Sequence, residues 1–226
     1  MNKIKGGINM SKPITSLQRQ LQQIVAKQLV DISRNPFVQG IAAGSLPSTA
    51  VATYVQQDNL YLQKYLTNYQ QVLGILAPDL LATTIHAIDT ENRAHQVLLA
   101  FLQTDNAQLM KGTVIELPTT RAYLQHIQTA ITANAWQGLA ALLACPLIYT
   151  QLAVELQQQQ AVVHRNPFAA WIDFYLPKAD YFTKRMIELF VNEGQTKSDY
   201  QQFHALQRFE ASCKYENAFF TQAMEE

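Results

Sequence analysis

The spacing of apolar residues constrains this chain more than any other feature, because it follows the α-helical period almost from end to end. Near the N-terminus, three- and four-residue steps give one apolar stripe, made of Leu17, Leu21, Ile24, Val25, Leu29 and Ile32. Only eight glycines and eight prolines are spread over 226 residues, which is too few for a turn-dense β-sandwich or barrel. The sequence therefore predicts an all-α protein, a helical bundle of about eight helices.

Prolines and polar capping residues predict where these helices begin and end. Asn35-Pro36 is expected to stop the first helix, because the residue before a proline is disfavoured in the α conformation. Later boundaries are predicted at Pro47, Pro78, Pro118, Asn134, Asn166-Pro167, Pro177 and Ser198-Asp199. Because no linker or fixed repeat interrupts the pattern, we expect residues 13–226 to form a single domain after a disordered tail, residues 1–12.

Charge and cysteine content exclude several functional classes. Seventeen basic residues balance seventeen acidic ones, whereas a nucleic-acid-binding surface needs an excess of Lys and Arg. Two cysteines are too few for a disulfide framework in a chain of this size. No run approaches the roughly 18 consecutive apolar residues of a membrane span, and the N-terminus lacks the apolar core of a signal peptide. We expect a cytoplasmic protein with neither a nucleic-acid nor a membrane partner.

Asp58 is an acid within a helical stripe of tyrosines. Tyr54, Tyr61 and Tyr65 lie at i−4, i+3 and i+7 from it, so phenol rings flank the carboxylate on one helix face. Half-buried packing with solvated hydroxyls would explain this pattern. A pocket wall would explain it equally, with rings that stack on a flat ligand and a carboxylate that accepts its N–H groups.

Cys145 and Glu216 have the chemistry of a site but an ambiguous context. Cys145 lies in the apolar run 139–149, where a cysteine is usually a small buried hydrophobe, although Tyr149 places a phenol one turn away. No basic neighbour in sequence would favour its thiolate. Glu216 lies among aromatic residues and is either an acid–base group or a surface acid on an amphipathic helix. Cys213 is interpreted as a packing residue.

A metal site is the weakest of the sequence hypotheses. Glu91 and His95 are at i and i+4 on one predicted helix, and His86 lies one further turn upstream. An iron carboxylate site in a bundle would need more inward Glu and His residues on facing helices. A structural hydrogen bond between Glu91 and His95 is therefore the preferred interpretation, and no metal site is predicted.

Five stretches, in the same order and spacing, carry a resemblance to a known family. They are 35–41 (NPFVQGI) with 44–47 (GSLP), 57–62 (QDNLYL), 139–149 around Cys145, 171–175 (WIDFY), and Tyr215-Glu216 with Phe219. On these stretches the chain resembles the TenA family, the thiaminase II enzymes of thiamin-pyrimidine salvage, from about Phe37 to Ala223. The resemblance implies the helical fold that this family shares with haem oxygenase.

The resemblance also implies roles for three residues whose context is ambiguous. Cys145 would be the nucleophile, Glu216 the acid–base residue, and Asp58 the group that holds the aminopyrimidine. The implied reaction is hydrolysis of 4-amino-5-aminomethyl-2-methylpyrimidine to the 5-hydroxymethyl compound and ammonia, and some members also split thiamin. No metal or organic cofactor is implied.

Tyrosines complete the implied site. Tyr61 would assist the cysteine, and Tyr149 and Tyr175 would line the pocket or position the glutamate. The family's homo-oligomer, a tetramer or dimer, is expected as well.

Two departures from the family pattern keep an alternative open. Arg121 takes the place where the family often has a tyrosine after the motif matching Pro118-Thr119, with Tyr123 two positions on. The chain also stops soon after Phe219-Phe220. The alternative function is a non-catalytic, pyrimidine-binding or regulatory helical module.

Overall fold

The computed structural model describes residues 16–160, 165–176 and 181–225, and within them all side chains except those of 82–92, 159–160 and 181. These described residues form helices and no strand, which confirms the predicted all-α class. The predicted tail, residues 1–12, and the boundary predicted at Pro177 lie outside the described residues.

Eleven α-helices and one 3-10 turn make up the described chain. In order, they are α1 (Ser16–Ile32), α2 (Pro36–Ala43), α3 (Ser48–Leu76), η1 (Pro78–Leu80), α4 (Leu81–Leu102), α5 (Asn106–Leu109), α6 (Pro118–Ala133), α7 (Ala135–Leu142), α8 (Ala144–Gln160), α9 (Ala169–Tyr175), α10 (Tyr181–Gly194) and α11 (Asp199–Glu225). This is more than the roughly eight helices predicted from the sequence. Breaks within the predicted segments separate short helices such as α5 and α7.

The predicted boundary residues end or begin helices by ordinary capping chemistry. The Asn35 side chain accepts a hydrogen bond from the backbone N–H of Phe37 at the start of α2. Gly44 closes the same helix with a φ of 69°, in the left-handed region that favours glycine. Pro118 is the first residue of α6, and Asn134 caps α7 by accepting from Gln137 N–H.

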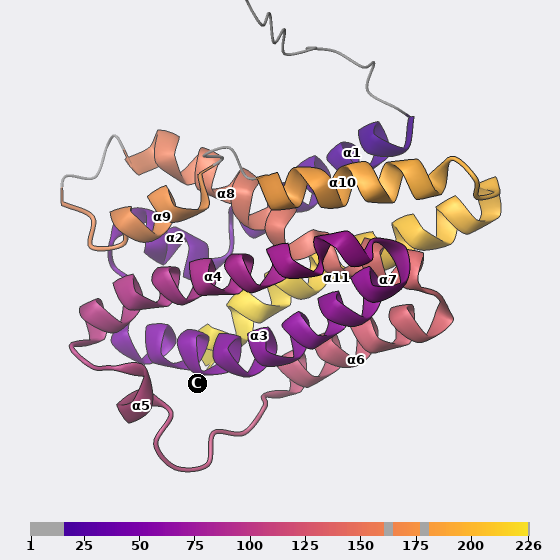
Figure 1. Ribbon diagram of the computed structural model, residues 1–226. Helices are drawn as coiled ribbons and strands as arrows, with labels where there is room; N and C mark the ends of the chain where they lie inside the picture. Colours follow the sequence, from indigo (N-terminus) through magenta and orange to yellow (C-terminus); the bar gives the residue numbers. More distant parts are fainter. Residues whose placement is uncertain (1–15, 161–164, 177–180, 226) are drawn as a thin grey trace, which may run out of the picture.

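Helix α11 is the central element of the bundle. It contacts α1, α2, α3, α6, α7 and α8, and in Figure 1 it runs behind the neighbouring pair α3 and α4. Its buried face continues almost to the C-terminus, from Ala205 to Ala223. Side chains from several helices therefore meet on α11 in the middle of the molecule.

A glycine allows α7 to approach α3 and α6 closely. A Cβ atom at Gly138 would lie 2.6 Å from Cγ1 of Ile131 and 3.0 Å from Cγ2 of Val72, so a larger residue would push these helices apart. This approach brings the end of α7, and with it Cys145, against α3.

One helical stretch of the described chain is apolar enough to cross a membrane by length and composition alone. It covers Ala135–Gln158, in α7 and α8, and 61% of its apolar window is buried inside the protein. Packing in the core explains its composition.

Candidate active site

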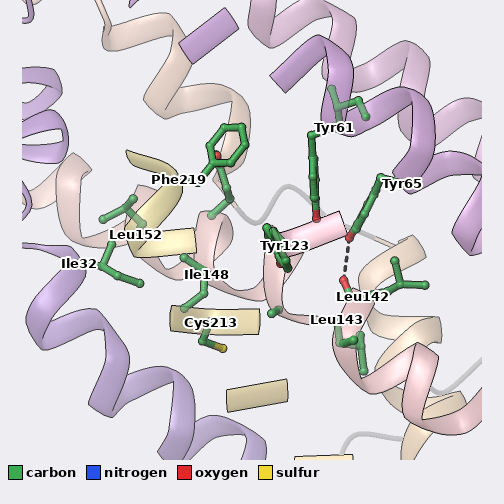
Figure 2. Close-up of a cluster of buried hydrophobic side chains, with 14 of the residues drawn as sticks. Ile32, Tyr61, Tyr65, Tyr123, Leu142, Leu143, Ile148, Leu152, Cys213 and Phe219 are labelled. Carbon is green, nitrogen blue, oxygen red and sulfur yellow. Dashed lines mark hydrogen bonds between the residues drawn. The ribbon is translucent and has the colours of Figure 1, made fainter. Parts of the chain in front are cut away.

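Cys145 lies at a break between two helices. Helix α7 ends at Leu142, and Cys145 is the second residue of α8. Pro146 follows and has no N–H to donate to the carbonyl four residues earlier, that of Leu142. The hydroxyls of Tyr65 and Tyr69 donate to this carbonyl instead, at 2.7 and 3.3 Å; Figure 2 shows the Tyr65 bond. The break thus leaves a partly exposed thiol at the start of a helix.

Glu216 is a buried carboxyl on α11, with 3% of its surface exposed. The hydroxyl of Tyr123, on α6, donates a hydrogen bond of 2.6 Å to its Oε1 atom. Burial raises the pKa of Tyr123 well above its usual value of 10.0, and the charge of Glu216 raises it further. Tyr123 therefore remains a hydrogen-bond donor to the carboxyl group.

Tyr61 lies between two other tyrosine rings (Figure 2). Its ring stacks on those of Tyr65 and Tyr123, with centroids 5.0 and 5.1 Å apart. Its hydroxyl is buried, and the nearby hydroxyl of Tyr123 is one of the groups that act on it. Burial raises the pKa of Tyr61 well above 10.0, and the charges of Cys145 and Glu216 are among the further causes. The neutral phenol therefore lies close to both of these groups.

Asp58 is paired with a histidine. Its Oδ2 atom lies 2.6 Å from Nε2 of His95, on α4, and both side chains are buried. The pairing places an acid–imidazole couple between α3 and α4. The side chains of Glu91 and His86 are outside the part of the chain that the structure describes. The Glu91–His95 hydrogen bond therefore stays a prediction. The described chain holds no cluster of three or more metal-binding side chains.

Tyr149 and Tyr175 meet within an aromatic cluster. Their ring centroids are 4.8 Å apart, and Tyr149 shares a hydroxyl–hydroxyl hydrogen bond of 2.7 Å with Tyr54. Burial raises the pKa of Tyr149 well above 10.0, and Asp58 and Glu216 are among the charges that raise it further. Tyr149 thus lies within electrostatic range of both Asp58 and Glu216.

The structure brings all six predicted site residues into one neighbourhood. Cys145 and Glu216 are both near enough to raise the pKa of Tyr61, and Asp58, Glu216 and Tyr175 are near enough to raise the pKa of Tyr149. The six residues come from four helices, α3, α8, α9 and α11. A fifth helix, α6, adds Tyr123 through its hydrogen bond to Glu216.

Two residues of this neighbourhood were missed as site residues in the sequence. In the sequence, Tyr123 stands out only as the tyrosine two positions after Arg121, and His95 only as a possible partner of Glu91. No local pattern points to Tyr123 or His95, because each is paired with a residue on a different helix: Glu216 on α11 and Asp58 on α3. Arg121 is exposed and donates to the backbone carbonyl of Glu116, so it does not bring its charge to the site.

The arrangement supports nucleophilic and acid–base chemistry on a small flat ligand. A thiol, a buried carboxyl group and a carboxylate–imidazole pair lie among aromatic rings that can stack on a planar molecule. Such a set can bind a ring, attack it with sulfur and move a proton to a leaving group.

Comparison with known proteins gives one family and one fold. The family model described as TENA/THI-4/PQQC family matches residues 20–226. An aminopyrimidine aminohydrolase from Staphylococcus aureus (strain MRSA252) is 25% identical over 213 residues, covering 91% of this chain and 93% of that protein.

Two solved structures extend the comparison to three dimensions. A TenA family transcription regulator from Silicibacter sp. TM1040 superposes with a TM-score of 0.77 at 18% identity, covering 96% of this chain and all (100%) of that one. A domain with a heme oxygenase-like fold from Shewanella denitrificans OS217 gives a TM-score of 0.64 at 14% identity, with 94% of each chain covered. These likenesses confirm the predicted haem-oxygenase-like fold.

Proposed function

The chain belongs to the TENA/THI-4/PQQC family, and we propose that it is an aminopyrimidine aminohydrolase of thiamin salvage. It would convert 4-amino-5-aminomethyl-2-methylpyrimidine and water to 4-amino-5-hydroxymethyl-2-methylpyrimidine and ammonia. The observation that carries the proposal is the shared neighbourhood of the Cys145 thiol and the buried Tyr123–Glu216 pair, since this reaction needs both a nucleophile and a proton donor.

Asp58 would bind the aminopyrimidine ring. His95 holds its Oδ2 atom, which leaves Oδ1 to accept the N–H groups of the amidine-like edge. A carboxylate in this position favours the ring protonated at nitrogen. A protonated ring is poorer in electrons and accepts a nucleophile more readily.

Cys145 would start the reaction by adding to an electron-poor ring carbon. The new C–S bond breaks the aromaticity, and the electrons then expel the amine from the adjacent CH₂ group. Glu216 gives its proton to the departing ammonia. Water adds to the exocyclic methylene, Glu216 takes the proton that the water loses, and release of the thiolate restores the aromatic ring.

The start of α8 supports the thiolate in this scheme. Cys145 lies in the first turn of α8, where backbone N–H groups favour a negative charge. The opposing carbonyl of Leu142 is bonded by two tyrosine hydroxyls. No basic residue neighbours Cys145 in the sequence. The start of α8 would stabilise the thiolate in place of such a residue.

Further expectations complete the proposal. We propose a single domain over residues 13–226, a cytoplasmic location and a homo-oligomeric state, a tetramer or dimer. Two large aromatic side chains support a subunit contact, since Tyr200 and Phe203 are 72% and 56% exposed on one side of α11.

The direct test is product analysis with the purified wild-type protein. We expect ammonia and the 5-hydroxymethyl pyrimidine in equal amounts from the aminomethyl substrate, with thiamin assayed in parallel. A folded protein that binds the pyrimidine but forms neither product would instead support the alternative, a non-catalytic binding or regulatory module. Because Arg121 is exposed, it no longer favours that alternative.

A further inference from the structure

Helix α6 lacks a capping side chain of its own at its N-terminus. Its N-cap residue is Leu117, which makes no side-chain cap, and the first helical residue is Pro118. The backbone donors there use side-chain amides from two other helices. Leu117 N–H donates to Gln57 Oε1 at 2.9 Å, and Thr120 N–H donates to Gln222 Oε1 at 3.3 Å. Two neighbouring helices, α3 and α11, therefore hold the start of α6.

The hydroxyl of Thr120 joins the same two amides. It donates to Gln57 Oε1 at 2.8 Å and accepts from Gln222 Nε2 at 2.9 Å. All three side chains are buried, with 0% to 5% of their surfaces exposed. Gln57 also donates to the carbonyl of Ile115, in the segment that leads into α6. One hydroxyl thus connects three helices in a fully buried network, where hydrogen bonds are costly to lose.

Two of the three joined helices carry the acidic groups of the site, and the third carries the tyrosine that bonds to one of them. Gln57 directly precedes Asp58 on α3, Gln222 is on the same helix as Glu216, and Thr120 lies one turn before Tyr123 on α6. A rotation or slip of α6 would change the Tyr123–Glu216 hydrogen bond of 2.6 Å.

We infer that Thr120 is a positioning residue that fixes the Tyr123–Glu216 pair through its bonds to Gln57 and Gln222. The inference rests on the proposed function for its kinetic consequence, although its geometric consequence stands without it. Thr120 touches no reacting atom and acts by holding the register of α6 against α3 and α11.

A matched set of variants tests the inference. Thr120→Val keeps the shape of the side chain and removes the hydroxyl, whereas Thr120→Ser keeps the hydroxyl. Thr129→Val makes the same change on the exposed side of α6, where the hydroxyl donates to the Gln125 carbonyl of its own helix. If Thr120→Val folds poorly, Gln222→Met breaks the network from α11.

Kinetic measurements per folded molecule give the first outcome. We expect kcat of Thr120→Val to fall by about 10- to 100-fold, because a displacement near 1 Å is enough for such a loss. The Ser variant should recover most of the rate, and Thr129→Val should match the wild type. Equal losses in Thr120→Val and Thr120→Ser, or a wild-type rate in Thr120→Val, would overturn the positioning role.

Crystal structures give an outcome that does not depend on activity. The separation of the Tyr123 hydroxyl from Glu216 should exceed hydrogen-bond distance in Thr120→Val and remain bonded in the Ser and Thr129 variants. An unchanged separation in Thr120→Val would overturn the inference. A wild-type protein without aminohydrolase activity would refute the proposed function, while this comparison would still decide the geometric claim.

Discussion

Glu216 shows how a single residue acquires its chemistry from the fold. Its carboxyl group is buried on the central helix, and a phenol from another helix donates to it at 2.6 Å. In water the same carboxyl would have no fixed partner. If Glu216 is the proton donor, as proposed, this fixed position is what it contributes to catalysis.

Tyr123→Phe tests this at the residue scale. The change removes one hydroxyl and keeps the ring that stacks on Tyr61, so the fold should survive. Loss of a hydrogen bond to a charged or acid–base group costs about 1.5–3 kcal/mol, and we expect kcat to fall by roughly 10- to 100-fold. Steady-state ammonia release measures this.

Tyr215→Phe is the matched control. Its ring also stacks on Tyr123, with centroids 5.1 Å apart, and it too changes one tyrosine to phenylalanine. We expect a rate within about twofold of the wild type. If both variants lost activity equally, ring packing rather than the bond to Glu216 would explain the loss.

Single residues are easier to single out in a sequence than their partners. Cys145, Glu216 and Asp58 are candidates because each lies in one of the stretches that carry the family resemblance. Tyr123 and Glu216 are 93 residues apart, and Asp58 and His95 are 37 apart. Such pairs depend on how helices pack, and no local pattern records that.

At the scale of elements, the α7–α8 break places the thiol. An uninterrupted helix would direct residue 145 differently and would use the Leu142 carbonyl internally. Pro146 prevents this, and Tyr65 and Tyr69 occupy the freed carbonyl. Prolines at helix starts, such as Pro118, were predictable from their local context. The break before Pro146 also has a local signal, the proline itself, but it was not among the predicted boundaries because the apolar run 139–149 continues through it.

Pro146→Ala should repair this break. The new N–H can donate to Leu142, so α7 and α8 can join, and the two tyrosine hydroxyls lose their acceptor. We expect a folded protein with unchanged or slightly higher helix content, and kcat/KM lower by about tenfold or more because Cys145 moves. Circular dichroism and kinetics measure the two effects.

Pro78→Ala controls for the loss of a proline in general. Pro78 is exposed at the start of the 3-10 turn η1, where an extra N–H needs no buried partner. It should keep the wild-type rate. A fully active Pro146→Ala protein with a continuous helix would contradict the assigned role of the break.

On the scale of the whole molecule, buried tyrosines couple the site to stability. Burial raises the pKa of Tyr61, Tyr65, Tyr123 and Tyr149 well above 10.0. The folded protein keeps these protons at a pH where the unfolded chain releases them. The stability that they contribute is therefore complete below about pH 10 and decreases as the pH rises further.

Alkaline unfolding should accordingly be steep and cooperative. Each of the four tyrosines lowers the free energy of unfolding by up to about 1.4 kcal/mol per pH unit above pH 10. Tyrosinate absorbance and circular dichroism, followed together, should show these phenols ionising only as helix is lost. Ionisation of all ten tyrosines with the helices intact would contradict the burial of the site.

At acid pH, His126 should lower the free energy of unfolding. Burial lowers its pKa in the folded protein, so the unfolded chain takes up the proton more readily as the pH falls below about 6.5.

The all-α class was predictable because helical periodicity is a property of the whole chain, repeated in every segment. The close approach of α7 to α3 was not, since it depends on what a Cβ at Gly138 would meet in two other helices. The candidate site depends on that packing, so the resemblance could propose its residues but not their geometry.

The central claim is that the Cys145 thiol is the nucleophile. The most direct test measures ammonia release from 4-amino-5-aminomethyl-2-methylpyrimidine by the wild type, Cys145→Ala and Cys213→Ala. Cys213 is fully buried in the core and serves as the matched cysteine. We expect the wild type and Cys213→Ala to release ammonia, and folded Cys145→Ala to be slower by about a thousandfold or more. Wild-type turnover by Cys145→Ala would show that this thiol is not the nucleophile.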